Sequence, residues 1–259
     1  MLLGAMLAPG PRTVTAALRI MGLALERRFT HSHRVLNRAT WSARQGSRRL
    51  RGLLLTVLVP QGATLVCGAD DTVERRSGRK RKATGCYREA ARSTKKPGIH
   101  GWGLQWGSMR LLVPVPWSRR VWAVPYWTAL CWPRQKRGTR RHTTSVDWVR
   151  PRLKYVRRWR PGRRLVLVVA GGCAAVALAL ACVKSRVPLV SRQRRAAALY
   201  PPPGPPPTGK RGPHPTQGKR QRSGQGWAER SDTPWETVAV TWDGGQRQKL
   251  WGFSRTALW

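Results

Sequence analysis

The chain has 259 residues, of which 41% are hydrophobic and 23% charged, so it can bury a core and wholesale disorder is excluded. Fifty Lys and Arg against ten Asp and Glu give a formal net charge of +40, which favours a polyanionic partner, most commonly nucleic acid. The alternative is functionless charge, as in a degenerate reading frame from GC-rich DNA. Five cysteines without a CxxC pair support neither a zinc motif nor a disulfide framework, and they fit a reducing cytoplasm.

Residues 1–60 are predicted to form a helical region. Val14, Leu18 and Met21 recur at helical spacing, and further helices are expected within 29–41 and over 42–58. Three short helices with basic faces are typical of a DNA-binding module of helix-turn-helix type. They suit equally well a small bundle that packs on a larger domain.

Residues 61–200 are predicted to form an α/β domain. The segment 63–78, "ATLVCGADDTVERRSG", has the pattern of a buried strand that ends in acids. Two further strands are expected in 103–116 and 119–132, where prolines indicate bends or a sheet edge. A helix follows in 142–159, with Thr144 or Ser145 as its cap, and Pro151 predicts that it begins or kinks there.

The run Leu165–Val183 has two interpretations. Its length of 19 residues meets the length rule for a membrane-spanning helix, which would make the chain a highly basic single-span membrane protein. Gly171 and Gly172, however, divide it into a Val-rich half and an Ala-rich half. We favour a strand, a Gly-Gly turn and a helix, because strands and helices alternate on both sides of the run. Another short strand is expected in 187–192.

Residues 201–226 are rich in Pro, Gly, Lys and Arg and are predicted to be a basic loop without a core. Within it, Lys219, Arg220 and Arg222 are candidate contacts for DNA phosphates. Residues 227–259 alternate in the manner of strands around Asp243-Gly244-Gly245, which predicts a hairpin. We expect this last region to be part of a β-rich domain that the chain leaves incomplete.

The predicted order of acid-bearing strand, two strands, helix, strand, helix and strand is that of a ribonuclease H-like core, a mixed sheet with helices. Several long segments also resemble bacterial insertion-sequence DDE transposases, of the group with a β-rich insertion before the final catalytic Glu. They include "GADDTVERRSGRK", "LLVPVPWSRRVWAVPYWTALCWP", "TSVDWVR", "PGRRLVLVV" and "GGQRQKLWGFSRTALW". The resemblance runs from about residue 2 to the end of the chain.

This resemblance implies a metal-dependent reaction that cleaves and joins DNA strands, with Mg²⁺ or Mn²⁺ held by three acids. The first acid corresponds to Asp70, with Asp71 as the fallback. The second should follow the strand "LVLVV", where this chain has Ala170, and a methyl group cannot bind a metal. None of Glu229, Asp232 and Glu236 matches the third acid, so metal binding is expected to be weak or lost.

The resemblance also implies DNA as the partner, both transposon ends and target DNA, and a homodimer is conceivable. Arg92, Lys95 and Lys96 would then lie near the DNA backbone, although solvated surface charge explains them equally well. The leading hypothesis is a transposase-derived DNA-binding protein, cytoplasmic and associated with the nucleoid, without strand-transfer activity. Two alternatives stay open, namely the membrane protein described above and a pseudogene product that does not fold.

Overall fold

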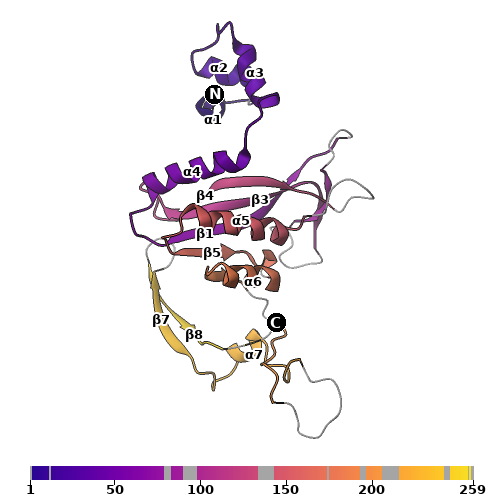
Figure 1. Cartoon of the computed structure of the whole chain (residues 1–259), viewed down its shortest axis with the longest axis vertical. Coiled ribbons are helices and arrows are strands. Elements are labelled where there is room, and N and C mark those ends of the chain that lie inside the picture. The colour runs from indigo at the N-terminus through magenta and orange to yellow at the C-terminus, as the bar shows by residue number, and fades with distance from the viewer. Residues whose placement is uncertain are drawn as a thin grey trace. The chain divides into compact units, whose positions relative to one another are not determined.

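The structure is a computed structural model that describes residues 2–11, 13–78, 83–89, 98–133, 143–173, 175–192, 197–205, 216–241, 246–255 and 257. The chain divides into two compact units, Met1–Gly46 and Ser47–Trp259. Figure 1 shows their helices and strands. The expected elements that fall in the remaining residues lie outside the described part of the chain.

The first unit consists of short helices, as predicted. They are α1 (Leu2–Leu7), α2 (Val14–Ile20) and α3 (Phe29–Asn37). The Thr13 hydroxyl caps α2 by accepting a hydrogen bond from the Ala16 amide, 3.1 Å away. α1 and α2 pack so closely that a Cβ at position 4 would collide with the backbone carbonyl of Ala17, and Gly4 avoids this collision. Helix α4 (Ala43–Leu58) follows, so the region 13–58 holds the three helices that the sequence predicts.

A mixed sheet forms the centre of the second unit. Its strands are β1 (Leu65–Arg75), β2 (Gly85–Arg88), β3 (His100–Pro114), β4 (Val121–Cys131), β5 (Leu165–Val169) and β6 (Leu189–Ser191). The strand order is β4-β3-β1-β5-β6, and β2 also pairs with β3. β3 is antiparallel to β1 and β4, whereas β5 is parallel to β1 and to β6. This order and these directions confirm the predicted ribonuclease H-like fold.

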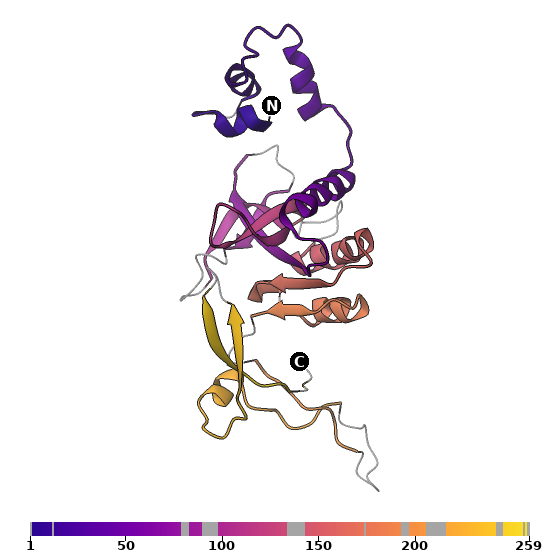
Figure 2. The same cartoon turned by 90° about the vertical axis from the view of Figure 1, so that its left-hand side faces the viewer.

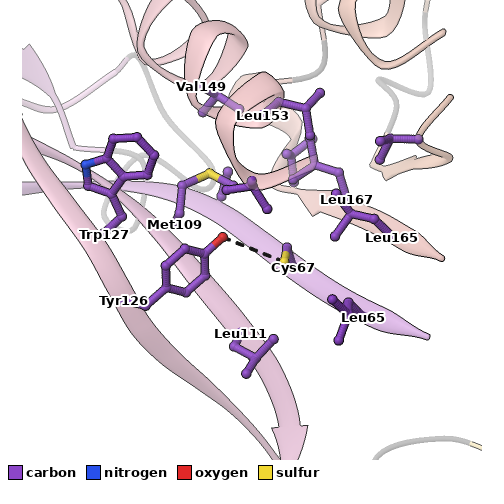
Figure 3. Close-up of a cluster of buried hydrophobic side chains, with 14 of the residues drawn as sticks. Leu65, Cys67, Met109, Leu111, Tyr126, Trp127, Val149, Leu153, Leu165 and Leu167 are labelled. Atoms are coloured by element: carbon purple, nitrogen blue, oxygen red, sulfur yellow. Dashed lines mark hydrogen bonds between the residues drawn. The ribbon is translucent and has the colours of Figure 1, made fainter. Parts of the chain in front are cut away.

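One face of this sheet carries the core. Side chains alternate along a strand, so Leu65, Cys67 and Ala69 of β1 point to the same side, and all are buried. They pack with Met109, Leu111 and Leu167 of the neighbouring strands and with Leu153 of α5 (Ser145–Trp159), as Figure 3 shows. The Tyr126 hydroxyl donates a hydrogen bond to Cys67 Sγ across 3.7 Å. Burial raises the pKa of the Cys67 thiol and keeps it protonated.

Helix α5 is fixed by its N-terminus and by its approach to β3. Thr144 and Asp147 form a capping box, in which the Thr144 hydroxyl accepts from the Asp147 amide at 3.1 Å. The helix begins at Ser145 and continues through Pro151, so it does not begin at that proline. Gly107 of β3 allows Trp148 to lie against the sheet, because a Cβ there would come within 2.7 Å of the indole ring.

The run 165–183 folds as the favoured interpretation predicts. It forms β5, a short 3₁₀ turn at Gly171–Cys173 and all but the last residue of α6 (Val176–Lys184). Figure 2 shows α5 and α6 on the same face of the sheet. Among the described residues, no helix combines the length and the apolar character needed to cross a membrane.

Two predictions made from prolines and turn residues are confirmed elsewhere in the second unit. β4 is an edge strand, and its Pro125 lies where the register between β3 and β4 shifts. β7 (Glu236–Thr241) and β8 (Arg247–Gly252) pair antiparallel as a separate two-stranded sheet. A short helix, α7 (Gly224–Ala228), precedes them. Asp243-Gly244-Gly245 lies outside the described residues.

Candidate active site

The two predicted acid positions, Asp70 and Ala170, are neighbours where the pairing of β1 with β5 ends. Asp70 lies in the middle of β1 and Ala170 follows the last residue of β5, so the prediction that the first strand ends at its acids is wrong. Ala69 pairs with Val169 in the parallel register, so Asp70 and Ala170 are the next residues along the two strands. Asp70 and Ala170 thus follow residues of the buried face, and alternation places Asp70 on the opposite face of the sheet. β1 continues to Arg75 whereas β5 ends at Val169, so beyond Ala69 the pairing of β1 continues with β3 and not with β5.

Asp70 is paired with a cation from the neighbouring strand. Its Oδ2 lies 3.2 Å from Arg110 Nη1 of β3, and the two side chains are 42% and 29% exposed. Arg110 lies between Met109 and Leu111, which both point into the core, so it shares the face of Asp70. The carboxylate is therefore accessible to solvent and already partly neutralised by the guanidinium.

Asp71 lies on the face that α5 covers. Gln105 Nε2 of β3 donates a hydrogen bond to Asp71 Oδ2 at 2.5 Å. Burial, chiefly, raises the pKa of Asp71, and the nearby charge of Asp70 adds to this rise, while the bond from Gln105 opposes it. Burial also raises the pKa of the Cys131 thiol to about 11, with a smaller contribution from the negative charge of Asp71. Asp71 is thus a half-buried acid among thiols, apart from Asp70.

Ala170 is exposed and is followed directly by the 3₁₀ turn. Its carbonyl oxygen accepts a hydrogen bond from the Cys173 amide at 2.9 Å, so its backbone group is engaged in the turn. Its side chain is a methyl group without a lone pair. Within the ranges that the structure describes, no cluster of three or more His, Cys, Asp or Glu side chains could hold a metal ion.

The predicted DNA contacts have different outcomes. Arg92, Lys95 and Lys96 lie outside the described residues. Lys219, Arg220 and Arg222 are exposed in the segment before α7, and the Arg222 guanidinium lies 5.7 Å from the centre of the Trp227 ring. Asp232, which the sequence interpretation assigned to the surface, forms an ion pair with Arg230. Glu229 accepts a hydrogen bond from Gln225, and Glu236 begins β7, which belongs to a different sheet from that of Asp70.

Sequence reasoning missed the two partners of the adjacent aspartates, Arg110 and Gln105. Both lie on β3, and only the antiparallel register between β1 and β3 brings them to Asp70 and Asp71. Alternation along "LQWGSMRLL" separates Gln105 from Arg110 by an odd number of residues and so assigns them to opposite faces. That pattern could have indicated two different environments, but not which aspartate each residue meets.

Comparison with known proteins identifies the family of this chain. Residues 1–249 match the family model described as DDE superfamily endonuclease. The chain therefore belongs to the DDE superfamily of endonucleases, as its segments predicted. No curated protein sequence matches it.

Solved structures similar to this chain include three transposase complexes. The piggyBac transposase synaptic complex with hairpin DNA is 10% identical, with a TM-score of 0.27, over 70% of this chain and 34% of that one. The Mos1 strand transfer complex is 12% identical, with a TM-score of 0.24, over 70% and 53%. A pre-cleavage Mos1 transpososome is 11% identical, with a TM-score of 0.25, over 70% and 55%. This chain matches between about one third and just over half of those proteins.

Endonucleases of this superfamily use divalent metal ions, which require carboxylate oxygens. The donors around Asp70 do not fit a pair of such ions. Asp70 contributes one carboxylate, the next strand contributes the methyl group of Ala170, and the charged neighbour of Asp70 is the cation Arg110. Asp71 cannot replace the missing ligand from its own position, because its side chain leaves β1 on the other face.

Proposed function

We propose that the protein is a DNA-binding derivative of an insertion-sequence transposase that does not cleave or transfer DNA strands. The observation that carries this proposal is the register of β1 and β5, which sets Ala170 beside Asp70. A site that clamps the attacking and leaving oxygens with two metal ions needs carboxylates that bridge and flank the ions. With a methyl group at position 170, one of these ligands is missing.

The ion pair of Asp70 supports the same conclusion. A cation that is held 3.2 Å from the carboxylate by its own strand competes with any metal ion for that carboxylate. Arg110 brings a positive charge to Asp70, but unlike a metal ion its guanidinium has no open coordination position for a reacting oxygen. Asp70 is thus retained in a site that favours a guanidinium over a divalent ion.

DNA binding is proposed from charge and family together. The chain has a formal net charge of +40, and Lys219, Arg220 and Arg222 present three exposed cations within four residues. Such contacts hold phosphates without reading sequence. We further propose that the protein acts in the bacterial cytoplasm on nucleoid DNA, as a homodimer that holds two DNA ends.

The first test asks whether the chain cleaves DNA. The purified protein is incubated with duplexes that carry the terminal repeats flanking its gene, with Mg²⁺ or Mn²⁺, and products are separated on denaturing gels. We expect binding without strand cleavage. Cleavage that disappears in Asp70→Ala would overturn the proposed inactivity and would identify Asp70 as a working ligand.

The second test restores the missing carboxylate. Mn²⁺ binding, followed by electron paramagnetic resonance, is compared in the wild type, Ala170→Asp and the uncharged control Ala170→Asn. Loss of supporting groups around a metal costs about 10–100-fold in affinity, so regaining a direct ligand should strengthen Mn²⁺ binding by about tenfold or more. The gain should vanish in Ala170→Asp with Asp70→Asn. Equal Mn²⁺ affinity in all variants would mean that positions 70 and 170 do not share a site.

A further inference from the structure

A hollow of about 500 Å³ lies between α5 and α6, on the outer side of the two helices. Ala177 and Ala181 contribute to its lining from α6, and their small side chains, one helical turn apart, leave the space open. Four cations surround it, which are Arg150, Lys154 and Arg158 of α5 and Lys184 of α6. We call this hollow and its four cations the α5–α6 groove.

The charge of the α5–α6 groove is largely uncompensated. Asp147 also lines it, and its Oδ1 lies 3.9 Å from Arg150 Nη1, so this acid offsets one cation. In the described ranges, no ion pair joins Lys154, Arg158 or Lys184 to a carboxylate, and all three residues are exposed. Three like charges around one hollow repel each other unless an anion enters between them.

The cations of α5 form a line. Arg150, Lys154 and Arg158 follow each other at four-residue intervals, which separates them by about 6 Å along the helix axis. Each DNA strand carries a phosphate about every 3.4 Å of duplex axis, so a helix along the backbone presents a cation to roughly every second phosphate. Lys184 faces this line from the other helix. A linear polyanion matches this arrangement better than a single small anion does.

The groove is separate from the Asp70 site. α5 and α6 lie on the same face of the sheet (Figure 2), and Cys67 and Ala69 point to this face. Alternation along β1 and β3 places Asp70 and Arg110 on the opposite face. DNA in the groove would therefore not be positioned for reaction at Asp70. It would be held on the helical face of the domain, on the side of the sheet opposite to Asp70.

We propose that the α5–α6 groove binds the sugar–phosphate backbone of DNA, independently of base sequence. This inference rests on the proposed DNA-binding function and assigns it a second surface, in addition to the segment around Lys219. Loss of the reaction at Asp70 leaves this surface intact, because no groove residue belongs to the Asp70 site.

The experiment measures binding of the full chain to a fluorescein-labelled duplex of arbitrary sequence over a series of salt concentrations. The groove variant is Lys154→Gln with Arg158→Gln and Lys184→Gln. The matched control, Arg119→Gln with Arg120→Gln and Lys249→Gln, removes the same charge at exposed positions away from the groove. Each phosphate contact contributes about 0.9 to the slope of log K against log salt, so the groove variant should lose about 2.7 and the control less than about 1.

The outcomes separate this inference from the proposed function. If the wild type binds DNA and both variants lose the same slope, binding is diffuse and the groove assignment is wrong, while the DNA-binding function stands. If the wild type does not bind DNA at low salt, both proposals fail. Circular dichroism checks folding of the triple variants. If the groove variant is unfolded, the three single substitutions replace it, each with an expected slope loss of about 0.9.

Discussion

One face of the central sheet carries Cys67, Met109 and Leu167, whose side chains are fully buried beneath helices, while the other carries Asp70, Arg110 and Leu112, all partly exposed. The first face holds the fold together through apolar packing. The second carries Asp70, which we propose as the first acid of the family, and contributes little to the core. The residue at position 170 is therefore expected to vary without weakening the fold, because the proposed site lies on a scaffold that is stabilised elsewhere.

The largest difference between the two faces is expected for leucine truncations. Leu167 is fully buried in the core, so Leu167→Ala should lower the free energy of unfolding by about 2–5 kcal/mol. Leu112→Ala is the matched control on the other face. Leu112 is only partly buried, and its truncation should cost less than half as much. Urea denaturation of both variants gives the two values, and equal costs would mean that both faces carry the core.

A smaller effect is expected at the N-terminus of α5, the helix that covers the buried face. Thr144→Ala removes the hydroxyl that accepts from the Asp147 amide and should cost about 1 kcal/mol. Ser223→Ala removes the equivalent cap of α7, in which the Ser223 hydroxyl accepts a hydrogen bond from the Gly226 amide at 3.2 Å. Because α7 has five residues and none is buried, the Ser223 variant should melt like the wild type. A comparable loss of stability in both variants would show that the effect of a cap does not depend on how well its helix is packed.

The sequence predicted most strands and helices in their order along the chain, because their signals are local, although it missed β2. The change from apolar runs to Gly-Gly and then to alanines marked β5 and α6, and Thr144 with Asp147 marked the start of α5. Pro151 would cost an isolated helix about 3 kcal/mol, yet α5 continues through it. In the protein, Val149, Leu153 and Val156 are buried on both sides of the proline, and this packing offsets the cost.

The candidate site was only partly predictable. Asp70 and Ala170 were singled out from segments of the sequence that resemble the family, and their roles in metal binding remain predictions. The partners depend on register. Arg110 meets Asp70, and Gln105 meets Asp71, only because β1 and β3 pair with Cys67 opposite Leu111. A shift of one residue would exchange the faces, and nothing in either strand alone fixes that choice.

A third prediction concerns pH. The expected change in the free energy of unfolding is smaller than that from loss of the α5 cap. Because burial raises the pKa of Asp71, the folded protein binds this proton more tightly than the unfolded chain does. Stability should then fall as the pH rises from about 4, the ordinary range of an Asp carboxyl, through the raised pKa of the folded state. Asp71→Asn keeps an acceptor for Gln105 and removes the titration.

The measurement is urea denaturation of the wild type and Asp71→Asn between pH 4 and pH 7. The variant should gain stability relative to the wild type as the pH rises. With only ten Asp and Glu in the chain, few other acids contribute to the background in this range. A relative stability of the two proteins that does not change with pH would show that Asp71 has the same pKa in the folded and unfolded states, and that the helix-covered face does not extend to this residue.

The smallest effect is expected for the ion pair on the open face. Arg110 and Asp70 are 29% and 42% exposed, and ion pairs of such exposure contribute about 0–1 kcal/mol. Arg110→Gln should therefore change the free energy of unfolding by less than about 1 kcal/mol, and by still less in high salt. A double-mutant cycle with Asp70→Asn isolates the coupling between the two side chains. A coupling above about 2 kcal/mol would overturn the comparison, because Asp70 would then be kept by a structural ion pair. A weak coupling would agree with the proposal that Asp70 descends from a metal-binding site, because the ion pair would then not account for its presence.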